Sequence, residues 1–406
     1  MNDPKQLKDR QEYSALQPSW INKALIEQAL RNDGEENPQV QAVDVRRALA
    51  EGENYGSTIY RVTAALSDGK ERSFIIKGPT VAGLSEATQP SGTFQREITM
   101  FTECIPKMEA LLEKCAPGRF PPLTPRCYHH ATCPVKFLVM EDLRPAGFRL
   151  AERKRGLGLR HSLLALRCLA RFHAASHALL RQQPELERVL DNMLNVADQG
   201  HQDFVKGELE ATALACRSWP GFQEIAERLD KFKTISGDVF DKINAPEPGG
   251  FNVISHGDFW TNNLMFRYED GNPEEFRAVD LQLAHVCSPV IDILHLFSNS
   301  VSDDVHAHHQ DLLLREYHVE LRRTLEILGH KAPSLESLQA AMEAHGSYAL
   351  YFALELPIVK ADEGLDLDAV SRGIYTDLLR VLETPDIKKR LQRSLLEYAR
   401  KGWLPA

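Results

Sequence analysis

The sequence predicts an α+β protein with a β-rich N-terminal lobe and a mainly helical C-terminal lobe. At 406 residues, the chain exceeds the length of about 250–300 residues at which a single hydrophobic core stops growing. Residues 39–142 contain short segments rich in Val, Ile and Thr between turn residues, which is typical of strands. From His161 onward, apolar residues recur at helical spacing. We therefore expect a helical extension over residues 1–38, a β-rich lobe over 39–142 and a helical lobe over 143–406.

Composition excludes several classes of protein. Apolar residues make up 43% of the chain and charged residues 26%, which is ordinary for a globular protein. The formal charge of -9 gives no basic surface for a nucleic acid or an anionic membrane. The 7 cysteines are scattered without a C-x-x-C pair, and the N-terminus lacks an apolar signal core. We expect a cytoplasmic protein with reduced thiols and no nucleic-acid, membrane or obligate protein partner.

The first elements follow from local spacing. Ser19 precedes Trp20 and a run with apolar residues at every fourth position, which predicts an N-capped amphipathic helix. After the helix breaker at residues 33–38, we expect three antiparallel strands joined by glycine-bearing turns, over residues 40–49, 58–66 and 72–77.

A further helix is expected over residues 93–104, because Phe94, Ile98 and Phe101 lie on one face of it. Glu97 lies on the same apolar face.

A buried strand is expected over residues 136–140, and Pro145 prevents further pairing beyond it, which places the boundary between the lobes. Helical periodicity dominates the second lobe, with helices expected over residues 161–180, 222–243, 308–328, 335–356 and 386–404. Residues 251–293 are a β-like exception that carries most of the polar residues suited to catalysis. Residues 186–248 and 348–360 carry no motif that we can interpret.

The strongest functional signal is the string from His256 to Asn263, which has the form H-G-D-x-x-x-x-N and is followed by Asp280 after a β-like run. Phosphoryl transfer needs such a set, in which one carboxylate orients and deprotonates the attacking hydroxyl while an Asn and a second Asp hold magnesium on the phosphates. The alternative is that Asp258 and Asn263 only cap a turn. The pattern favours a phosphotransferase that uses ATP and Mg²⁺.

Residues 254–263, together with residues 280–282 and 288–292, resemble the ecdysteroid kinase-like family. That family belongs to the choline kinase and aminoglycoside phosphotransferase branch of the protein kinase-like fold, so the resemblance implies a bilobal protein kinase-like fold. The family usually has Asp-Phe-Gln where this chain has Asp280-Leu281-Gln282, and the leucine keeps an apolar anchor there.

The resemblance also implies a role for each position of the motif. Asp258 would be the catalytic residue, and Asn263 and Asp280 would be the magnesium ligands. Asp292 would brace the catalytic loop through backbone amides, and His256 would support the same loop.

Lys77 ends the third expected strand and Glu97 follows on the next helix, the order in which a Lys-Glu ion pair positions the α- and β-phosphates of ATP. The alternative for each residue is a surface charge at an element end. Two neighbouring segments should also contact the nucleotide. The glycine-bearing turn would cover the phosphates with Asn54, Tyr55, Gly56 and Ser57, and the alternative is that it is only a hairpin. The hinge would meet the adenine edge with Met140, Glu141 and Leu143.

Three further features have a purely structural explanation as an alternative to a functional one. Glu141 and Asp142 could instead cap the connection after their strand. His173 stands beside small residues in a helix and is interpreted as a core histidine. Residues 303–309 hold Asp303, Asp304 and three histidines but no closed set of metal ligands, and their metal binding stays open (His306, His308 and His309).

We therefore predict a small-molecule kinase that phosphorylates a hydroxyl group, with an ecdysteroid-like or other lipophilic alcohol as the expected acceptor. The stretch between Asp280 and Asp292 is too short for the activation segment on which protein kinases dock a peptide. Phe259 and Trp260 adjoin Asp258 and are expected beside the acceptor. The alternatives are a choline- or aminoglycoside-type kinase, which would need an acidic or aromatic cage, and a non-catalytic nucleotide-binding pseudokinase scaffold.

Overall fold

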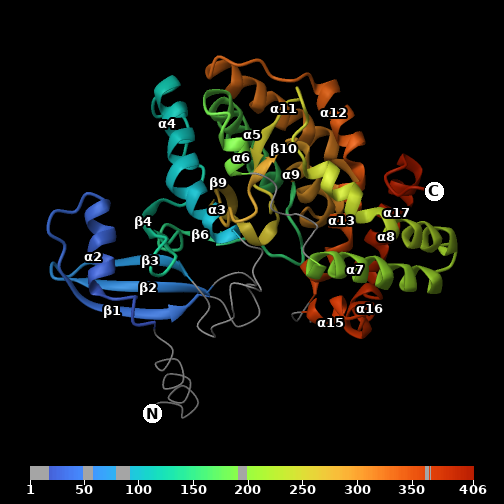
Figure 1. Cartoon of the computed structure of the whole chain (residues 1–406), viewed down its shortest axis with the longest axis horizontal. Helices are drawn as coiled ribbons and strands as arrows, with labels where there is room; N and C mark the ends of the chain where they lie inside the picture. The colour runs from blue at the N-terminus through green and yellow to red at the C-terminus, as the bar shows by residue number, and fades with distance from the viewer. Residues whose placement is uncertain (1–17, 49–57, 79–91, 191–198, 362–364, 366) are drawn as a thin grey trace, which may run out of the picture. The chain divides into compact units, whose positions relative to one another are not determined.

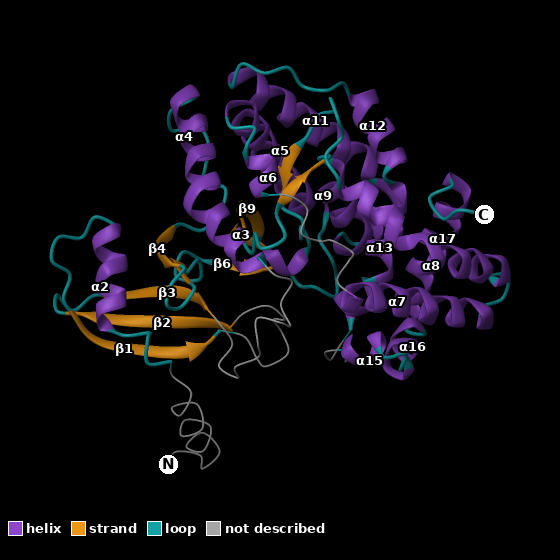
Figure 2. Ribbon diagram, in the orientation of Figure 1, coloured by secondary structure: helices purple, strands orange, loops and turns teal. Residues whose placement is uncertain are grey.

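The computed structural model describes residues 18–48, 58–78, 92–190, 199–361, 365 and 367–406. The chain divides into two compact units, the first made of residues 1–103 and 124–148, the second of residues 104–123 and 149–406. Strands dominate the first unit and helices the second (Figure 1 and Figure 2). The predicted α+β class, with a β-rich N-terminal part and a mainly helical C-terminal part, is confirmed.

The first unit is built on one antiparallel five-stranded sheet with the order β1-β2-β3-β5-β4. The three strands expected near the N-terminus and the strand expected at 136–140 are all present, whereas β4 was missed because its sequence is half polar. The elements are α2 (Lys23–Asn32), β1 (Val40–Arg47), β2 (Thr58–Leu66), β3 (Glu71–Gly78), α3 (Thr93–Thr99), β4 (Cys127–Ala131) and β5 (Phe137–Glu141).

Helix α2 packs its apolar face on this sheet (Figure 1). Ile26 and Leu30 are fully buried in a core that includes Val62 of β2. The predicted N-cap at Ser19 is wrong, because the side chain of Asn22 accepts the capping hydrogen bond from the Leu25 amide at 3.1 Å.

The helix expected over residues 93–104 forms with a change of pitch. Helix α3 passes into the π-helical turn η2 (Met100–Cys104) and then into α4 (Ile105–Cys115). Pro106 follows directly after the π-helical turn in a continuous helical run, and a proline, which has no amide hydrogen to donate to the preceding turn, is a common cause of such a change in helical geometry.

The second unit holds a large helical core with short strands among the helices. The single helix expected over residues 335–356 is interrupted at His345, which ends α12 and precedes α13. The next residue, Gly346, lies against the ring of Trp403, where a Cβ atom would not fit. The helices are α5 (Leu159–Gln182), α6 (Leu186–Val189), α7 (Gln199–Ser218), α8 (Gln223–Asn244), α9 (Val290–His295), η4 (Leu296–Ser300), α10 (Asp303–His308), α11 (Gln310–Ile327), α12 (Leu335–Ala344), α13 (Gly346–Leu354), α14 (Leu356–Lys360), α15 (Leu367–Ser371), α16 (Thr376–Leu382) and α17 (Pro385–Lys401).

Two small sheets position the polar residues of this unit. Their orders are β6-β8-β9 and β10-β7. The short 3-10 turn η3 (Thr261–Asn263) leads directly into β8, and the strands are β6 (Phe148–Leu150), β7 (Val253–Ser255), β8 (Leu264–Glu269), β9 (Asn272–Ala278) and β10 (His285–Cys287). Within the part of the chain that the structure describes, no helix has the length and apolar character needed to cross a membrane.

Candidate functional site

The loop that follows β7 is held by one buried carboxylate. Asp292 on α9 has no exposed surface, and its two oxygens accept hydrogen bonds from the backbone amides of His256 at 2.7 Å and Gly257 at 2.9 Å. These are backbone amides of the loop, the kind of partner that the family resemblance implied for Asp292. Two charge-assisted bonds to adjacent amides fix the orientation of the peptide planes just before Asp258.

Gly257 explains why the motif reads H-G-D. Its φ of 78° lies in the left-handed region, and a Cβ atom built on it would overlap the carbonyl oxygen of Leu283. Glycine therefore meets two requirements at this position, a left-handed backbone and a close approach of two chain segments. The arginine that protein kinases have here would satisfy neither.

The imidazole of His256 ties the loop to the strand that precedes Asp280. The Asp258 amide donates to Nδ1 of His256 at 3.3 Å, so Nε2 carries the proton and donates to the carbonyl oxygen of Val279 at 3.1 Å. Burial lowers the pKa of His256, which keeps the ring neutral in this tautomer. His256 thus acts as a spacer between the two segments that carry Asp258 and Asp280.

Asp258 and Asn263 are in direct contact. The side-chain amide nitrogen of Asn263 donates to Oδ2 of Asp258 at 2.7 Å and to the Asp258 carbonyl oxygen at 3.0 Å. Because the nitrogen makes both bonds, the amide oxygen of Asn263 is the atom that could bind a cation. The contact also fixes the rotamer of the Asp258 carboxylate.

The β8–β9 hairpin brings Asn263 near Asp280. Leu264 pairs with Ala278 in its register, and the amide of Val279 donates to the carbonyl oxygen of Asn263 at 3.0 Å. Asp280 itself has a φ of 66°, a left-handed conformation that is uncommon outside glycine and occurs often at functional positions. The side chain following it, Leu281, is fully buried and serves as an apolar anchor.

The donor set of this hairpin fits Mg²⁺. Asn263 and Asp280 offer an amide oxygen and a carboxylate, and Mg²⁺ in phosphotransferases is held by one or two protein oxygen ligands together with substrate phosphates. Among the described residues, no group of three or more His, Cys, Asp or Glu side chains could hold a metal by itself. A site completed by the phosphates of a nucleotide agrees with both facts.

Asp292 has a second set of partners that the sequence did not reveal. Nε2 of His173 lies 3.0 Å from Oδ2 of Asp292, and the other ring nitrogen lies 2.8 Å from the hydroxyl of Tyr317. All three side chains are fully buried. Burial alone would raise the pKa of Asp292, but the hydrogen bond from His173, aided by the loop amides, outweighs it and lowers that pKa. His173 is a core histidine, as expected, and also a positioning residue for the loop.

Lys77 and Glu97 form a buried ion pair in the first unit. Their charged atoms lie 2.7 Å apart, and the two side chains are 2% and 1% exposed. Lys77 lies on the central strand β3, paired with Ile59 on one side and Leu138 on the other. The alternative of two surface charges is therefore wrong.

The segment after β5 is tied mainly by Asp142. Its carboxylate accepts from Arg61 and Ser73, each at 2.7 Å, and from the Arg144 amide at 3.2 Å, so Asp142 caps the connection. Met140 and Leu143 are both buried, and the amide of Glu141 donates to the Arg126 carbonyl oxygen. Asn54, Tyr55, Gly56 and Ser57 lie outside the described residues. The adenine and phosphate contacts of these segments stay predictions.

One expectation about the acceptor is wrong. Phe259 is 1% exposed and packs against the rings of His256 and Phe276, so it belongs to the core and cannot contact an acceptor. The acidic and histidine-rich segment 303–309 is also structural in part, since Asp303 pairs with Arg390 at 2.9 Å.

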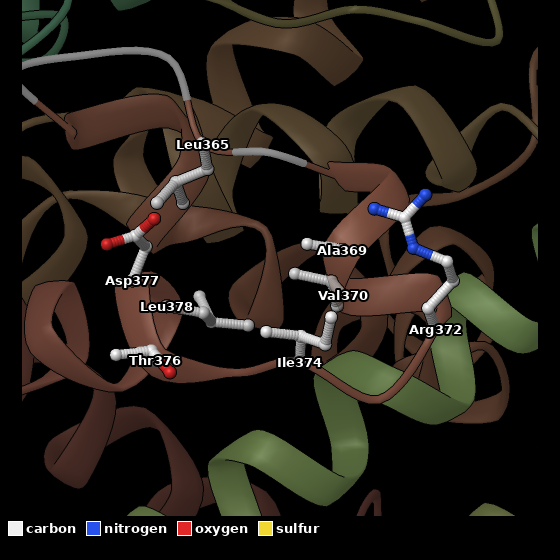
Figure 3. A pocket seen from close by; sticks show the side chains of 8 residues that line it. All are labelled: Leu365, Ala369, Val370, Arg372, Ile374, Thr376, Asp377 and Leu378. Atoms are coloured by element: carbon white, nitrogen blue, oxygen red, sulfur yellow. The ribbon is translucent and has the colours of Figure 1, made fainter.

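A pocket of about 230 Å³ lies around α15 and α16 (Figure 3). Figure 3 shows the apolar side chains of Val370, Ile374 and Leu378 gathered together while the Arg372 side chain extends away from them. None of the predicted site residues lines this pocket.

Comparisons with known proteins agree with the resemblance. The model of the ecdysteroid kinase-like family matches residues 51–330, well over half of the chain, and this range contains every motif discussed above. The chain belongs to the ecdysteroid kinase-like family. A search of curated proteins found no match.

Among solved structures, the chain is similar to the GDP and kanamycin complex of the aminoglycoside phosphotransferase APH(2")-IIia. The sequences are 13% identical, the TM-score is 0.37, and the match covers 91% of this chain and 99% of that one. A TM-score of that size does not by itself establish a common fold, so the family assignment depends on the sequence model.

Proposed function

We propose that this protein is a phosphotransferase that uses ATP and Mg²⁺ to phosphorylate a hydroxyl group of a small molecule, an ecdysteroid-like or other lipophilic alcohol. The observation that carries the proposal is the contact of Asp258 with Asn263 in a loop whose backbone amides are held by the buried Asp292. Membership of the ecdysteroid kinase-like family supports the nature of the acceptor.

Asp258 is the proposed catalytic residue. Its carboxylate would accept a hydrogen bond from the acceptor hydroxyl and take up the proton as that oxygen attacks the γ-phosphorus of ATP. A new oxygen–phosphorus bond forms, the bond from the γ-phosphorus to the bridging oxygen breaks, and ADP leaves. Asn263 keeps the carboxylate oriented, because its amide bonds to one of the two oxygens.

The remaining residues have proposed roles in nucleotide binding. Mg²⁺ bound by Asn263 and Asp280 would neutralise charge on the phosphates. Lys77, oriented by Glu97, would bind the α- and β-phosphates. Adenine would be met by the hinge and the phosphates covered by the glycine-bearing turn, which comprise Met140, Glu141, Leu143, Asn54, Tyr55, Gly56 and Ser57.

The proposed division of labour follows these roles. Residues 39–142 would form the nucleotide-binding lobe, residues 143–406 would hold the catalytic loop and the acceptor site, and residues 1–38 would form an N-terminal extension. A peptide acceptor is disfavoured, because the stretch from Asp280 to Asp292 is short and strand β10 lies within it. The pseudokinase alternative would be favoured by loss of Lys77, Asp258 or Asp280, and all three are present.

The experiment incubates the protein with Mg-ATP and parallel panels of steroid alcohols, amino alcohols, aminoglycosides and peptides, and detects the gain of one phosphate by mass spectrometry. We expect transfer to a steroid alcohol, with Asp258→Asn lowering kcat by about 10³-fold. Asp280→Asn should weaken Mg-ATP binding in calorimetry more than Asp258→Asn does.

Each other outcome has a definite meaning. Transfer to choline or an aminoglycoside alone would mean that the acceptor is of the choline or aminoglycoside type and not a lipophilic alcohol. Transfer to a peptide would contradict the small-molecule proposal. Mg-ATP binding without any transfer would favour the pseudokinase scaffold. Equal loss of Mg-ATP affinity in the two variants would remove the division of roles between Asp258 and Asp280.

A further inference from the structure

Two buried glutamates of the second unit stand apart from the residues already described. Glu208 on α7 is 1% exposed, and within the described residues neither of its carboxyl oxygens has a hydrogen-bond partner. Glu355, between α13 and α14, has a side chain that is 22% exposed. The two carboxyls are close enough for the charge of Glu355 to raise the pKa of Glu208, beyond the larger effect of burial.

Glu355 is connected to the catalytic loop by a short chain of hydrogen bonds. The side-chain amide of Asn299 donates to Glu355 at 3.3 Å, and its oxygen accepts from the hydroxyl of Ser300 at 2.7 Å. The same hydroxyl accepts from the backbone amide of Thr261 at 3.1 Å. Thr261 lies three residues after Asp258, whose charge is near enough to raise the pKa of Glu355, again after burial as the main cause.

Among the described residues, no lysine or arginine forms a salt bridge with Glu208 or Glu355. Nε2 of His295 lies 3.8 Å from Glu355, and the His295 ring stacks on Phe352 at 3.6 Å. Burial lowers the pKa of His295 to about 3, so the ring is neutral, and its Nδ1 has no hydrogen-bond partner among the described residues. Among the described residues, the carboxyl of Glu208 and one ring nitrogen of His295 therefore lack the partners that buried polar groups require, and both lie beside Glu355.

We propose that Glu355 and Glu208 form the polar end of the acceptor site, where Glu355 binds a second hydroxyl or carbonyl oxygen of a neutral acceptor while Asp258 takes the hydroxyl that is phosphorylated. The inference rests on the proposed function and narrows its substrate class to neutral compounds with at least two oxygen functions. A protonated carboxyl both donates and accepts a hydrogen bond, so it matches a hydroxyl or carbonyl oxygen.

Partial exposure makes Glu355 the member of the pair that a ligand can reach. Burial, with a smaller effect from the charge of Asp258, raises the pKa of Glu355 to about 8, so this carboxyl is protonated at neutral pH. Glu208 is more deeply buried, and its pKa is raised as well, so the two carboxyls do not ionise together. An ammonium group would demand the opposite state, with at least one carboxylate ionised. The Glu355→Gln variant therefore distinguishes neutral acceptors from acceptors that carry an ammonium group. Glutamine can still form hydrogen bonds but cannot ionise.

The kinetic test compares Glu355→Gln and Glu355→Leu on a steroid with two hydroxyls and on its counterpart lacking the hydroxyl that is not phosphorylated. For the diol, we expect Glu355→Gln to change KM by less than about threefold, and Glu355→Leu to raise it at least tenfold with a smaller change in kcat, the pattern of lost binding. For the single alcohol, the two variants should match the wild-type protein. Glu247→Gln is the matched control, because Glu247 also lies beside a histidine, His345, and is assigned no role in the site.

A stability measurement tests Glu208 independently of kinetics. Glu208→Met replaces an unpartnered buried carboxyl by an apolar side chain of similar size, so it should raise Tm by a few degrees while raising KM for the diol. A residue with only a structural role would lower Tm.

Three results would overturn the inference. The first is equal KM values for the diol in Glu355→Leu and the wild-type protein, the second is a loss of Tm in Glu208→Met, and the third is an amine acceptor whose phosphorylation Glu355→Gln abolishes. In each case, transfer that depends on Asp258 would leave the proposed function standing. Absence of transfer to every acceptor would instead overturn the proposed function.

Discussion

Asp292 and Glu208 are both buried carboxyls of the second unit, and their surroundings differ completely. Asp292 receives two backbone amides and the ring of His173, and its pKa is lowered. Glu208 receives no hydrogen bond within the described residues, and its pKa is raised well above the ordinary value. Burial is equal, so the donors decide whether the carboxyl carries a charge.

The difference separates two parts of a functional site. Around Asp292, the protein supplies every partner itself, and the loop from His256 to Asn263 is fixed before any ligand arrives. Around Glu355, the carboxyl oxygens of Glu208 and Nδ1 of His295 are buried without hydrogen-bond partners in the part of the chain that the structure describes, which leaves polar groups that a ligand could pair with. The catalytic loop is therefore preorganised by the protein in the first region, whereas the polar groups of the second region are proposed to gain their partners when the acceptor binds.

The largest expected effect comes from removing the charge that holds the loop. Asp292→Asn cannot accept from both amides and from His173, and it leaves buried donors without an acceptor. We expect a loss of about 3–5 kcal/mol in the free energy of unfolding and a fall in kcat of at least about 100-fold. Urea unfolding and turnover measurements check this, and an unchanged unfolding midpoint would break the contrast with Glu208.

The ion pair of Lys77 and Glu97 extends the comparison to the first unit. Both side chains are buried, so Lys77→Met alone strands the charge of Glu97 and should cost about 3 kcal/mol of stability. Glu97→Gln in the same chain should restore most of that stability without restoring turnover, because the phosphates still lack their lysine. Measurements of thermal unfolding and of kcat for the single and double variants test whether stability returns without turnover. Recovery of both quantities together would make the pair purely structural.

A third prediction concerns the backbone of the loop. Gly257→Ala places a Cβ atom against the carbonyl oxygen of Leu283 in a left-handed conformation, whereas Gly329 has the same φ of 78° and open space around it. Gly329→Ala should therefore cost only about 1 kcal/mol, from the backbone conformation, and leave turnover unchanged. Gly257→Ala should cost about 2–3 kcal/mol and lower kcat. Equal effects in the two variants would show that the close approach to Leu283 does not matter.

Much of the preorganised region could be predicted from the sequence, because it is encoded locally. The string from His256 to Asn263 holds its residues within eight positions, and the hairpin that returns to Asp280 follows directly. The pairing of Lys77 with Glu97 could be predicted because Lys77 lies at the end of an expected strand and Glu97 lies on the apolar face of an expected helix. Nothing local indicates that Tyr317 touches His173, since 144 positions separate them.

The acceptor region could not be predicted, for a related reason. Glu208 and Glu355 belong to two segments without any motif, and only the packing of α7 near α13 brings their carboxyls together. The same limitation explains the wrong expectation for Phe259, whose neighbour Phe276 lies on β9. An aromatic residue beside a catalytic aspartate is as compatible with the core as with a ligand site, and only tertiary contacts distinguish the two.

The smallest expected effect is a difference in how stability depends on pH. The folded pKa of Asp292 is lowered, so its contribution is present above the unfolded value near 4 and is lost as the pH falls through the folded pKa. The folded pKa of Glu208 is raised, so its carboxyl favours folding below the unfolded value and loses that advantage as the pH rises through the folded pKa. Glu208→Gln removes only the second contribution. The stability advantage of this variant over the wild-type protein should therefore grow as the pH is raised from about 4.5 to 8, while the acid limb of the wild-type profile is retained. Chemical unfolding at four or five pH values measures the difference, and Glu247→Gln provides the control for an exposed glutamate. A constant difference across this range would mean that Glu208 is ionised in the folded protein, and the contrast with Asp292 would disappear.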